Sequence, residues 1–426
     1  MHILFLTHYF PPEVNAPASR TYENARRWVR DGHHVTVITC APNHPKGIIY
    51  AGYKNRLWQW DEKDGIRILR VKTYLSANKG FARRILNYLS YMISATVFCA
   101  LVSKADRVVS TSPQFFCGLA GLLVSRIHRC PWVLEIRDLW PESIITVGAI
   151  QNRWIIRILE GIESFMYRKA DHIVAVTHSF KKHICERGIE ANKITVITNG
   201  ADLTLFQPGS KHNNVRDELG LKDEFVVSFI GTHGMAHGLE TVLKTAEMLR
   251  SRKDIVFLLV GDGAERDNLL KSKNAMKLNN VIMLQQQPKE RMPEFLAASD
   301  ACMVLLKKSD LFKTVIPSKI FEAMAMERSI ILGVDGESRK IIEDSGCGVF
   351  IEPENAAQLR DTVEKMSMNN AWTKSLGKAG YHFVRKNFSR EYLSKKYVSL
   401  LEETNKREFG KLDQAGQHLC KSRQRE

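Results

Sequence analysis

Residues 316–326, with the sequence IPSKIFEAMAM, form the stretch around which the rest of the chain can be arranged. They follow the apolar run DACMVLL (residues 300–306), which predicts a buried strand. The proline suits the start of a helix because its φ is fixed and it has no N–H. Ser318 can cap that helix, and apolar side chains then recur at helical spacing. We therefore predict a strand, a loop and a helix, with Lys319 and Glu322 one helical turn apart.

This arrangement has two interpretations at the level of local chemistry. A helix N-terminus flanked by Lys319 attracts phosphate, and the carboxylate of Glu322 can accept hydrogen bonds from a ribose diol. An ordinary capped amphipathic helix, with the same two side chains as a solvated pair, fits the stretch equally well. Both interpretations stay open until the surrounding chain is considered.

The composition describes a globular protein with more than one core. A chain of 426 residues should divide into two domains of about 200 residues each. The hydrophobic content of 44% and the seven Trp exclude a disordered chain. The eight Cys are scattered without a CxxC pair, which predicts buried free thiols in a reducing compartment and no zinc site.

The formal net charge of +16 is unevenly distributed. Residues 1–200 carry 27 Lys and Arg against 15 Asp and Glu, a net charge of +12. A basic N-terminal half indicates a polyanionic partner such as nucleic acid, an anionic membrane surface or a phosphorylated substrate, although it also fits a merely soluble basic surface. No RNP, zinc-finger or helix-turn-helix signature is present, so nucleic acid is not expected.

The first 40 residues predict a βαβ unit. The apolar run at residues 1–6 predicts a strand, Ser19 can cap a helix over residues 20–30, and residues 35–39 predict the next strand. Such a unit implies a parallel, doubly wound sheet. The first run is too short and too poor in leading positive charge for a signal peptide, so we expect a cytoplasmic protein. The glycine fingerprint of dinucleotide folds is missing, which argues against NAD binding in this half.

Residues 85–103 contain no charged side chain and approach transmembrane length. Polar side chains such as Asn87 dilute the apolar character, and basic residues flank the stretch. A strand at residues 107–110 follows at once, as after a βαβ crossover. The stretch therefore predicts a buried crossover helix, with a helix leaning on a bilayer and a true membrane span as the alternatives.

Another buried strand, at residues 132–136, ends in the polar stretch RDLWPE at residues 137–142. Ligands collect beyond the carboxyl ends of strands in open α/β sheets, so this stretch is a candidate site. The alternative is an Arg–carboxylate pair that only braces a loop. Residues 203–222 contain Pro-Gly-Ser and few apolar side chains, which predicts an interdomain linker.

A second series of strands begins at residues 225–230 and is followed by GTHGMAHG at residues 231–238. A Gly-rich turn between a strand and a helix lets backbone N–H groups approach a phosphate, but tight turns need Gly without any ligand. The polar stretch after residue 406 is expected to be disordered.

Taken together, several short motifs resemble the retaining glycosyltransferases of family 4. They are Gly-x-x-Gly at 231–234, VGDG at 260–263, NGAD at 199–202 and PSKIFEAMA at 317–325, and they occur in the order found in that family. RDLWPES at 137–143, together with the last motif, further resembles the amino-sugar transferases of O-antigen and capsule synthesis, such as the L-fucosamine transferases.

The resemblance covers nearly the whole chain and implies the GT-B fold, in which two Rossmann-like, doubly wound parallel-sheet domains face a central cleft. The implied division is an acceptor-side domain over residues 1–203 and a nucleotide-sugar-binding domain over 204–388. A C-terminal helix over 389–405 would pack back on the first domain, and 406–426 would be a disordered tail.

The resemblance also implies a role for each matching residue. Asp138, Arg137 and Lys319 would be catalytic, and Glu322 would hold the ribose. The donor-binding residues would be Gly231, Thr232, His233, Gly234, His237, Gln287, Pro288, Lys313, Ser318, Lys319 and Glu322. The acceptor side would be lined by Glu13, Asn15, Ala16 and Glu142.

Two departures from the family pattern affect this assignment. Thr314 stands where the family often has a second Glu, and the common Arg and Lys after the Gly-rich turn are missing, with His237 near the Lys position. Neutralisation of the diphosphate is then shared by Lys313, Lys319 and His237.

The resemblance implies a metal-independent transfer with retention, in which no cofactor takes part and no residue serves as a metal ligand. The donor would be a UDP-linked N-acetylated amino or deoxyamino sugar, such as L-fucosamine, and the acceptor a polyprenyl-diphosphate-linked saccharide of O-antigen or capsule synthesis. The protein would lie on the inner face of the bacterial plasma membrane, held by its basic N-terminal half. A UDP-sugar 2-epimerase of the same architecture and a non-catalytic sugar-nucleotide-binding subunit are the alternatives.

Overall fold

The computed structural model describes residues 1–404 except 14, 45, 77–80, 147–149 and 151. The chain divides into two compact units. The first comprises Met1–Thr198 together with the chain from Leu393 onward, and the second is Asn199–Tyr392. We had predicted boundaries after residues 203 and 388, so both lie a few residues away from their expected places. The predicted disordered tail lies outside the described residues.

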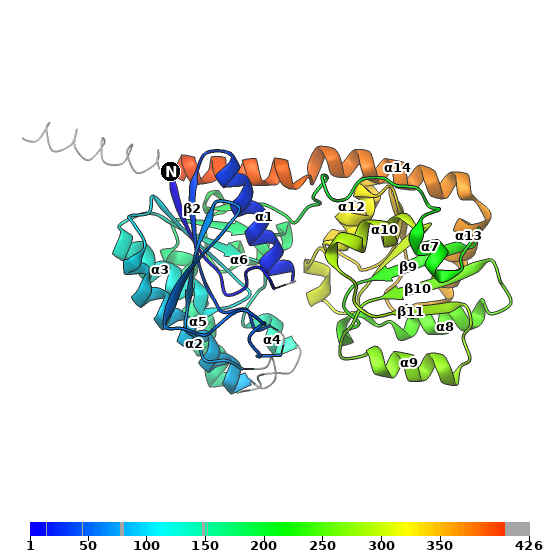
Figure 1. The fold of residues 1–426 in the computed structure, drawn as a ribbon, viewed down its shortest axis with the longest axis horizontal. Helices are drawn as coiled ribbons and strands as arrows, with labels where there is room; N and C mark the ends of the chain where they lie inside the picture. The colour runs from blue at the N-terminus through cyan, green and yellow to red at the C-terminus, as the bar shows by residue number, and fades with distance from the viewer. Residues whose placement is uncertain (14, 45, 77–80, 147–149, 151, 405–426) are drawn as a thin grey trace, which may run out of the picture. The chain divides into compact units, whose positions relative to one another are not determined.

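The first unit contains an eight-stranded sheet in the order β3-β4-β2-β1-β5-β6-β7-β8 (Figure 1). All neighbouring strands are parallel except the pair β3 and β4. The strands are β1 (His2–Leu6), β2 (His34–Cys40), β3 (Trp58–Lys63), β4 (Ile66–Val71), β5 (Arg107–Thr111), β6 (Trp132–Ile136), β7 (His172–Ala175) and β8 (Ile194–Val196).

Helices cover this sheet, and a C-terminal helix completes its core. The helices are α1 (Ala16–Arg30), α2 (Phe81–Phe98), the 3₁₀ turn η1 (Cys99–Leu101), α3 (Phe116–His128), α4 (Glu142–Thr146), α5 (Arg153–Lys169), α6 (His178–Glu186) and the 3₁₀ turn η2 (Ala191–Lys193). Residues 393–404 are helical and lie beside α1 (Figure 1). Tyr397 and Leu401 are fully buried in one cluster with Trp28, whose Nε1 donates to the Ser394 carbonyl at 3.3 Å.

Two local features of this unit escaped the sequence analysis. The hairpin β3–β4 turns through Asp64 and Gly65, both at positive φ, and an Asp-Gly pair is the usual signal for such a turn. The prediction that Ser19 caps the first helix was wrong. The helix begins at Ala16 because the Asn15 side chain accepts the N–H of Ala18 at 2.8 Å and a proline follows at residue 17.

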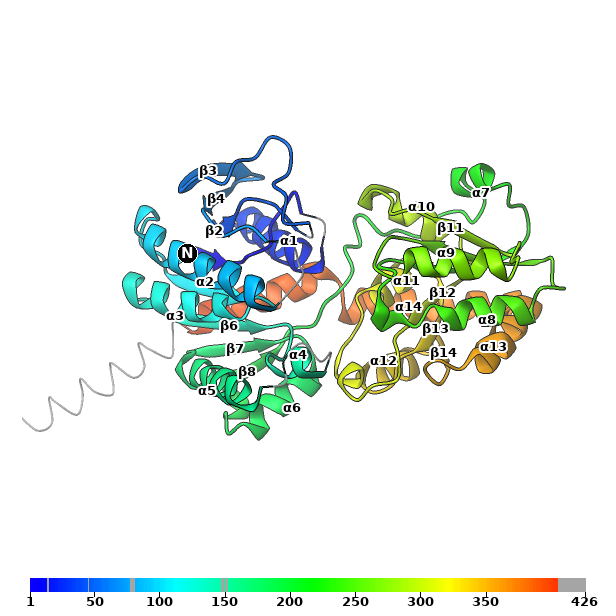
Figure 2. The same cartoon turned by 90° about the horizontal axis from the view of Figure 1, so that it is seen from below.

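The uncharged stretch forms α2, which packs against α3 on the first unit (Figure 2). Residues Arg83–Leu101 are long and apolar enough to cross a membrane by length and composition, and 28% of them are buried in the structure. One such helix is weak evidence for a span. A helix of which so little is buried does not fit the predicted fully buried crossover helix.

The second unit contains a six-stranded parallel sheet in the order β11-β10-β9-β12-β13-β14. The strands are β9 (Phe225–Ile230), β10 (Ile255–Val260), β11 (Val281–Leu284), β12 (Ala301–Leu305), β13 (Ser329–Gly333) and β14 (Gly348–Phe350). The helices are α7 (Asn214–Leu219), α8 (Glu240–Met248), α9 (Arg266–Ala275), α10 (Met292–Ala297), α11 (Lys319–Ala325), α12 (Glu337–Ser345), α13 (Ala356–Met368) and α14 (Asn370–Asn387), with short 3₁₀ turns η3 (Met235–His237), η4 (Lys289–Arg291) and η5 (Leu311–Thr314).

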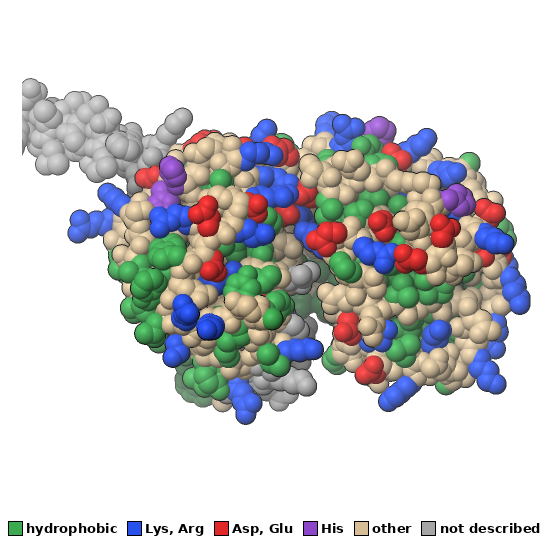
Figure 3. Space-filling view, in the orientation of Figure 1, with side chains coloured by type: hydrophobic (Ala, Val, Ile, Leu, Met, Phe, Trp, Pro, Cys, Tyr) green, Lys and Arg blue, Asp and Glu red, His purple; other side chains and the backbone are tan. Residues whose placement is uncertain are grey.

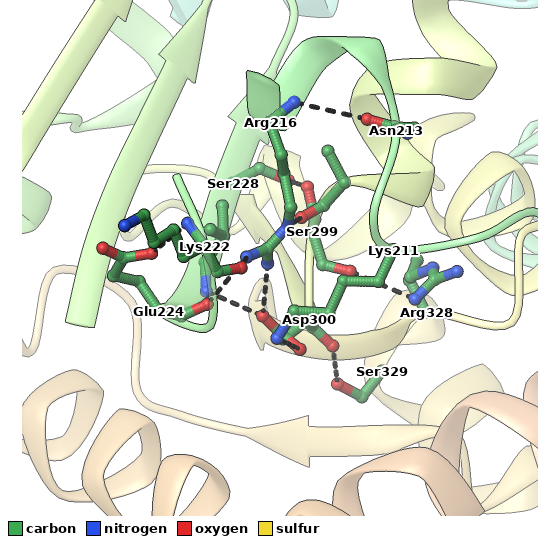
Figure 4. A network of polar contacts seen from close by, with 12 residues as sticks. Lys211, Asn213, Arg216, Lys222, Glu224, Ser228, Ser299, Asp300, Arg328 and Ser329 are labelled. Carbon is green, nitrogen blue, oxygen red and sulfur yellow. Dashed lines mark hydrogen bonds and ion pairs between the residues drawn. The ribbon is translucent and has the colours of Figure 1, made fainter. Parts of the chain in front are cut away.

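The prediction that residues 203–222 form a linker was wrong. They contain α7 and belong to the second unit, where Arg216 is almost fully buried. Figure 4 shows its guanidinium, which donates to Asp300 at 3.0 Å and to backbone carbonyls, while Lys211 contacts the other Asp300 oxygen at 2.6 Å. Asp300 precedes β12, so this network braces the amino ends of the strands.

Within the described residues, seven cysteines are free and five of them are buried, as predicted. The same residues contain no group of three or more His, Cys, Asp and Glu side chains that could hold a metal ion.

Candidate active site

The candidate donor site lies at the carboxyl edge of the second sheet, where the strand order reverses. The chain starts at β9, moves outward to β10 and β11, and then returns to the other side of β9 for β12. The loops after β9 and β12 therefore separate and leave a crevice, the usual ligand position in doubly wound sheets. Gly231 follows β9, and Lys319 is the first helical residue after β12.

The two Gly-rich loops pack backbone against backbone. The N–H of Gly231 donates to the Val260 carbonyl at 2.8 Å, and the N–H of His233 donates to the Asp262 carbonyl at 2.9 Å. A Cβ on Gly261, which has φ +154°, would lie 1.9 Å from the Gly231 carbonyl oxygen. The VGDG motif is therefore required by this close approach, which leaves the loop after β9 rigidly placed.

Lys319 extends its side chain over the first glycine of that loop. A Cβ on Gly231 would lie 2.5 Å from Lys319 Cε, so only glycine leaves room for the lysine. The Nζ atom is buried, lacks a hydrogen-bond partner among the described residues, and lies 3.7 Å from the centroid of the Phe229 ring. Burial lowers the pKa of Lys319 to about 7, and the nearby Glu322 carboxylate opposes this only in part. A buried ammonium without an acceptor is a place prepared for an anion.

Two histidines lie beside Lys319. His233 is fully buried, and neither ring nitrogen has a hydrogen-bond partner in the described structure. The Nδ1 of His237 lies 3.1 Å from the Leu305 carbonyl and, as the N–H tautomer, donates to it. Burial, with the cations Arg266 and Lys319, lowers the pKa of His233 to about 4, and burial with Lys319 does the same for His237. Both rings are therefore neutral at pH 7, so His237 adds a hydrogen-bonding group and no charge to the site.

Arg266 is a cation that the sequence analysis missed. It begins α9 directly after the VGDG loop, its Nε is buried without a partner, and its charge acts on His233. A basic residue directly after a glycine loop was the available signal. Arg266 can replace the family's missing Arg near the Gly-rich turn.

Glu322 lies one turn after Lys319 and shares a cavity of about 30 Å³ with it. Burial raises the pKa of the Glu322 carboxyl, while the cations Arg390, Lys289 and Lys319 act in the opposite direction. The prediction that Ser318 caps the helix was wrong. Ser318 already has helical backbone angles and its side chain makes no capping hydrogen bond.

The remaining predicted donor residues lie on the same edge of the sheet or near it. Thr232 is exposed and Gly234 is half-buried in the loop after β9. Gln287 and Pro288 follow β11, and Gln287 donates to the Gln285 carbonyl at 3.2 Å. Lys313 is bound to Asp310 at 2.8 Å on the exposed turn η5, away from the buried lysine.

In the first unit, Asp138 and Arg137 follow β6 and have different neighbours. The Asp138 carboxylate accepts the Ser143 hydroxyl at 3.0 Å, and burial raises its pKa against the influence of this bond and of Arg84. The backbone N–H of Arg137 donates to the Ser112 hydroxyl at 2.7 Å. The charge of Arg137 helps to lower the pKa of buried Glu135. Asp138 is thus a buried carboxyl at the carboxyl edge of this sheet.

The predicted acceptor-side residues make structural contacts. The buried Glu13 carboxylate accepts the N–H groups of Asn43 and His44 at 2.8 and 2.9 Å, so it fixes the loop after β2. Asn15 caps α1, which starts at Ala16. The Glu142 carboxylate begins α4 and lies 3.5 Å from His183 Nδ1.

Comparison with known proteins assigns the chain to a class. Residues 15–200 match the family model of the glycosyl transferase 4-like domain, and residues 211–383 match the model of glycosyl transferases group 1. The chain is 23% identical over 373 residues to the colanic acid biosynthesis glycosyl transferase WcaI of Escherichia coli K12, covering 84% of this chain and 90% of that protein.

The fold is shared with solved glycosyltransferase structures. Sucrose-phosphate synthase of Thermosynechococcus elongatus superposes with a TM-score of 0.73 at 16% identity, covering 94% of this chain and 98% of that chain. HepE of Anabaena in complex with UDP and glucose superposes with a TM-score of 0.71 at 17% identity, covering 94% and 99%. The predicted GT-B fold is confirmed, and the chain belongs to the glycosyltransferases, enzymes that transfer sugars.

Proposed function

We propose that this glycosyltransferase moves a sugar from a UDP-sugar to a polyprenyl-diphosphate-linked saccharide. The observation that carries the donor half of this proposal is the buried Nζ of Lys319, which has no acceptor among the described residues and lies against Gly231 at the strand-order reversal. An anionic diphosphate supplies the acceptor that this ammonium lacks.

The chemistry of the transfer requires such a cation. When the bond between the sugar and the diphosphate breaks, negative charge develops on the leaving phosphate oxygen. Lys319 lies where it can stabilise that charge, with Arg266 as a second cation. His233 and His237 add uncharged hydrogen-bonding groups. The Gly-rich loop brings its backbone N–H groups close to the phosphates, because no Cβ intervenes at Gly231.

Glu322 is proposed to hold the ribose of the nucleotide. Its carboxylate lies one turn from Lys319, so it can accept hydrogen bonds from the two ribose hydroxyls while the lysine contacts the diphosphate. Asp138, a buried carboxyl of the first unit, is proposed to act near the reacting hydroxyl of the acceptor.

The finer assignments follow from likeness to other proteins. UDP is proposed because HepE, a fold neighbour, was solved with UDP and glucose, and polysaccharide synthesis because WcaI is named for colanic acid biosynthesis. Family 4 membership, retention and an amino sugar such as L-fucosamine rest on the motifs at 137–143 and 314–325. In a retaining transfer without an obligatory metal, the leaving phosphate takes the proton of the acceptor hydroxyl.

Attachment to the inner face of the plasma membrane is also part of the proposal. The acceptor is embedded in lipid, and the net charge of +12 over residues 1–200 favours an anionic membrane surface.

The experiment is incubation of the protein with a panel of UDP-linked sugars, with and without a polyprenyl-diphosphate-linked saccharide, followed by product analysis with and without EDTA. A glycolipid formed only with acceptor, and equally in EDTA, supports the proposal. Release of the 2-epimer without acceptor would show an isomerase, and binding without turnover would show a non-catalytic subunit.

A further inference from the structure

A second polar hollow lies in the first unit, at the carboxyl edge of the eight-stranded sheet. His8 follows β1, the loop with Asn43 and His44 follows β2, and Arg84 and Tyr88 project from α2. The hollow measures about 310 Å³, including the space open to solvent. It adjoins the point where the strand order of this sheet reverses, between β1 and β5.

The hollow is basic and contains no carboxylate among its lining residues. The guanidinium of Arg84 makes one hydrogen bond, from Nη2 to the Tyr88 hydroxyl at 3.3 Å, and its buried Nε has no partner among the described residues. No Asp or Glu of the described chain forms an ion pair with it. An arginine without a carboxylate partner in a polar hollow is suited to phosphate.

The nearest acidic groups are already engaged. Glu13 directs one carboxylate oxygen to the N–H groups of Asn43 and His44, which holds the rim of the hollow. Asp138 is hydrogen-bonded to Ser143, and the charge of Arg84 reaches it and lowers its pKa. The hollow therefore lies beside the carboxyl that we propose to act on the acceptor.

The opposite face of α2 is apolar and open. Leu86, Ile93, Val97 and Leu101 are 54%, 58%, 60% and 44% exposed, and their spacing of seven, four and four residues places them along one stripe of the helix. Leu123 and Ile127 of the adjoining α3 are exposed as well, and Figure 3 shows hydrophobic side chains gathered over this part of the unit.

The charges around this stripe are basic. Residues 81–105 contain Arg83, Arg84 and Lys104 and no Asp or Glu, and α3 also contains no acidic residue. An apolar stripe bordered by cations alone complements a lipid with an anionic headgroup.

We propose that this hollow binds the phosphate of a phosphorylated lipid, whose apolar chain lies along the exposed stripe of α2. Arg84 and the His44 ring contact the phosphate oxygens, and the stripe rests on the bilayer. The inference rests on the proposed function in one respect, that this lipid is the acceptor. Because a single helix carries both faces, it specifies a lipid phosphate, which a soluble phosphate ester would not need.

The test compares Arg84→Gln with Arg83→Gln, its exposed neighbour. Binding is measured by co-sedimentation with phosphatidylcholine vesicles that do or do not contain polyprenyl diphosphate. Loss of charged hydrogen bonds should weaken binding to the diphosphate-containing vesicles about 10- to 100-fold in Arg84→Gln, and less than about threefold in Arg83→Gln. Equal losses in the two variants would overturn the proposal, because they would show unspecific attraction by surface charge.

Two further measurements decide the source of the phosphate. Ile93→Asn and Val97→Asn should weaken binding to the vesicles while leaving the affinity for inorganic pyrophosphate unchanged. If these variants bind the vesicles like the wild type, or if pyrophosphate binds as tightly as the lipid, the lipid assignment is wrong. Arg84→Lys, which retains the charge, should recover part of the binding, and a melting temperature close to that of the wild type shows that the variants are folded.

The outcome is separable from that of the proposed function. Sugar transfer that persists unchanged in Arg84→Gln would overturn this site and leave the enzyme assignment intact. Selective lipid binding through Arg84 without turnover of any UDP-sugar would do the reverse.

Discussion

Raising the pH from 7 to 9 should weaken the binding of a UDP-sugar about 50-fold, because Lys319 must carry a proton to bind the diphosphate. Burial lowers the pKa of Lys319 to about 7 in the free protein, so half of the molecules are protonated at pH 7 and about one in a hundred at pH 9. A bound diphosphate raises the pKa of this lysine again. Each pH unit above 7 therefore costs about 1.4 kcal/mol of binding free energy.

The same lysine links folding stability to pH, and the sign follows from the two pKa values. The ordinary value is 10.5 and the folded value is about 7, so between these pH values the unfolded chain binds more protons than the native protein. Stability without donor should rise with pH across this window, by an upper limit of about 5 kcal/mol. Lys319→Met should accordingly stabilise the free protein at pH 7, and this advantage should disappear towards pH 10.5.

Isothermal titration calorimetry with UDP-glucose as the probe measures the binding effect, since its diphosphate diester does not titrate in this range. At pH 8, titrations in two buffers of different ionisation enthalpy should reveal uptake of nearly one proton per UDP-glucose bound. Lys319→Met should show weak binding without proton uptake, and the exposed Lys308→Met should behave like the wild type. An affinity that stays constant between pH 7 and 9, with no proton uptake, would refute the reasoning.

Three further outcomes are expected. Glu322→Gln should weaken UDP binding about tenfold and abolish the preference for UDP over its 2′-deoxy analogue, measured by calorimetry; an unchanged preference would remove Glu322 from the ribose. Gly261→Ala should destabilise the second unit by more than about 2 kcal/mol in urea unfolding, because its Cβ would meet a carbonyl oxygen at 1.9 Å, whereas Gly346→Ala, with open space around it, should cost about 1 kcal/mol; equal effects would contradict the loop packing. Asp300→Asn should cost about 3–5 kcal/mol without altering UDP affinity at pH 7, whereas the exposed Glu218→Gln, which loses an ion pair with Arg291, should cost less than about 1 kcal/mol; a loss of UDP affinity in folded Asp300→Asn would contradict its bracing role.

The positions of the strands and the choice of Lys319 and Glu322 could be predicted because local patterns determine them. A run of apolar residues such as 255–260 becomes a buried parallel strand over the same residues in the structure. A proline followed by helical apolar spacing places Lys319 at the start of α11, directly beyond a strand. These features depend on residues close together in the sequence.

The features that escaped prediction depend on contacts between distant residues. The sequence alone does not reveal that Gly261 contacts Gly231, or that Glu13 satisfies the backbone of residues 43–44 thirty positions later. The segment 203–222 looked like a linker because its one large buried side chain is Arg216, whose charge is compensated by Asp300. Its burial depends on that remote partner and leaves no apolar signal.

The central claim is that the ammonium of Lys319 stabilises the leaving diphosphate of a sugar donor. The most direct test is the rate of sugar transfer to a polyprenyl-diphosphate-linked saccharide by Lys319→Met and by Lys308→Met, each corrected for its folded fraction by thermal unfolding. The account predicts that kcat/KM falls at least about 100-fold in Lys319→Met and is unchanged in Lys308→Met. Full activity in folded Lys319→Met would contradict it.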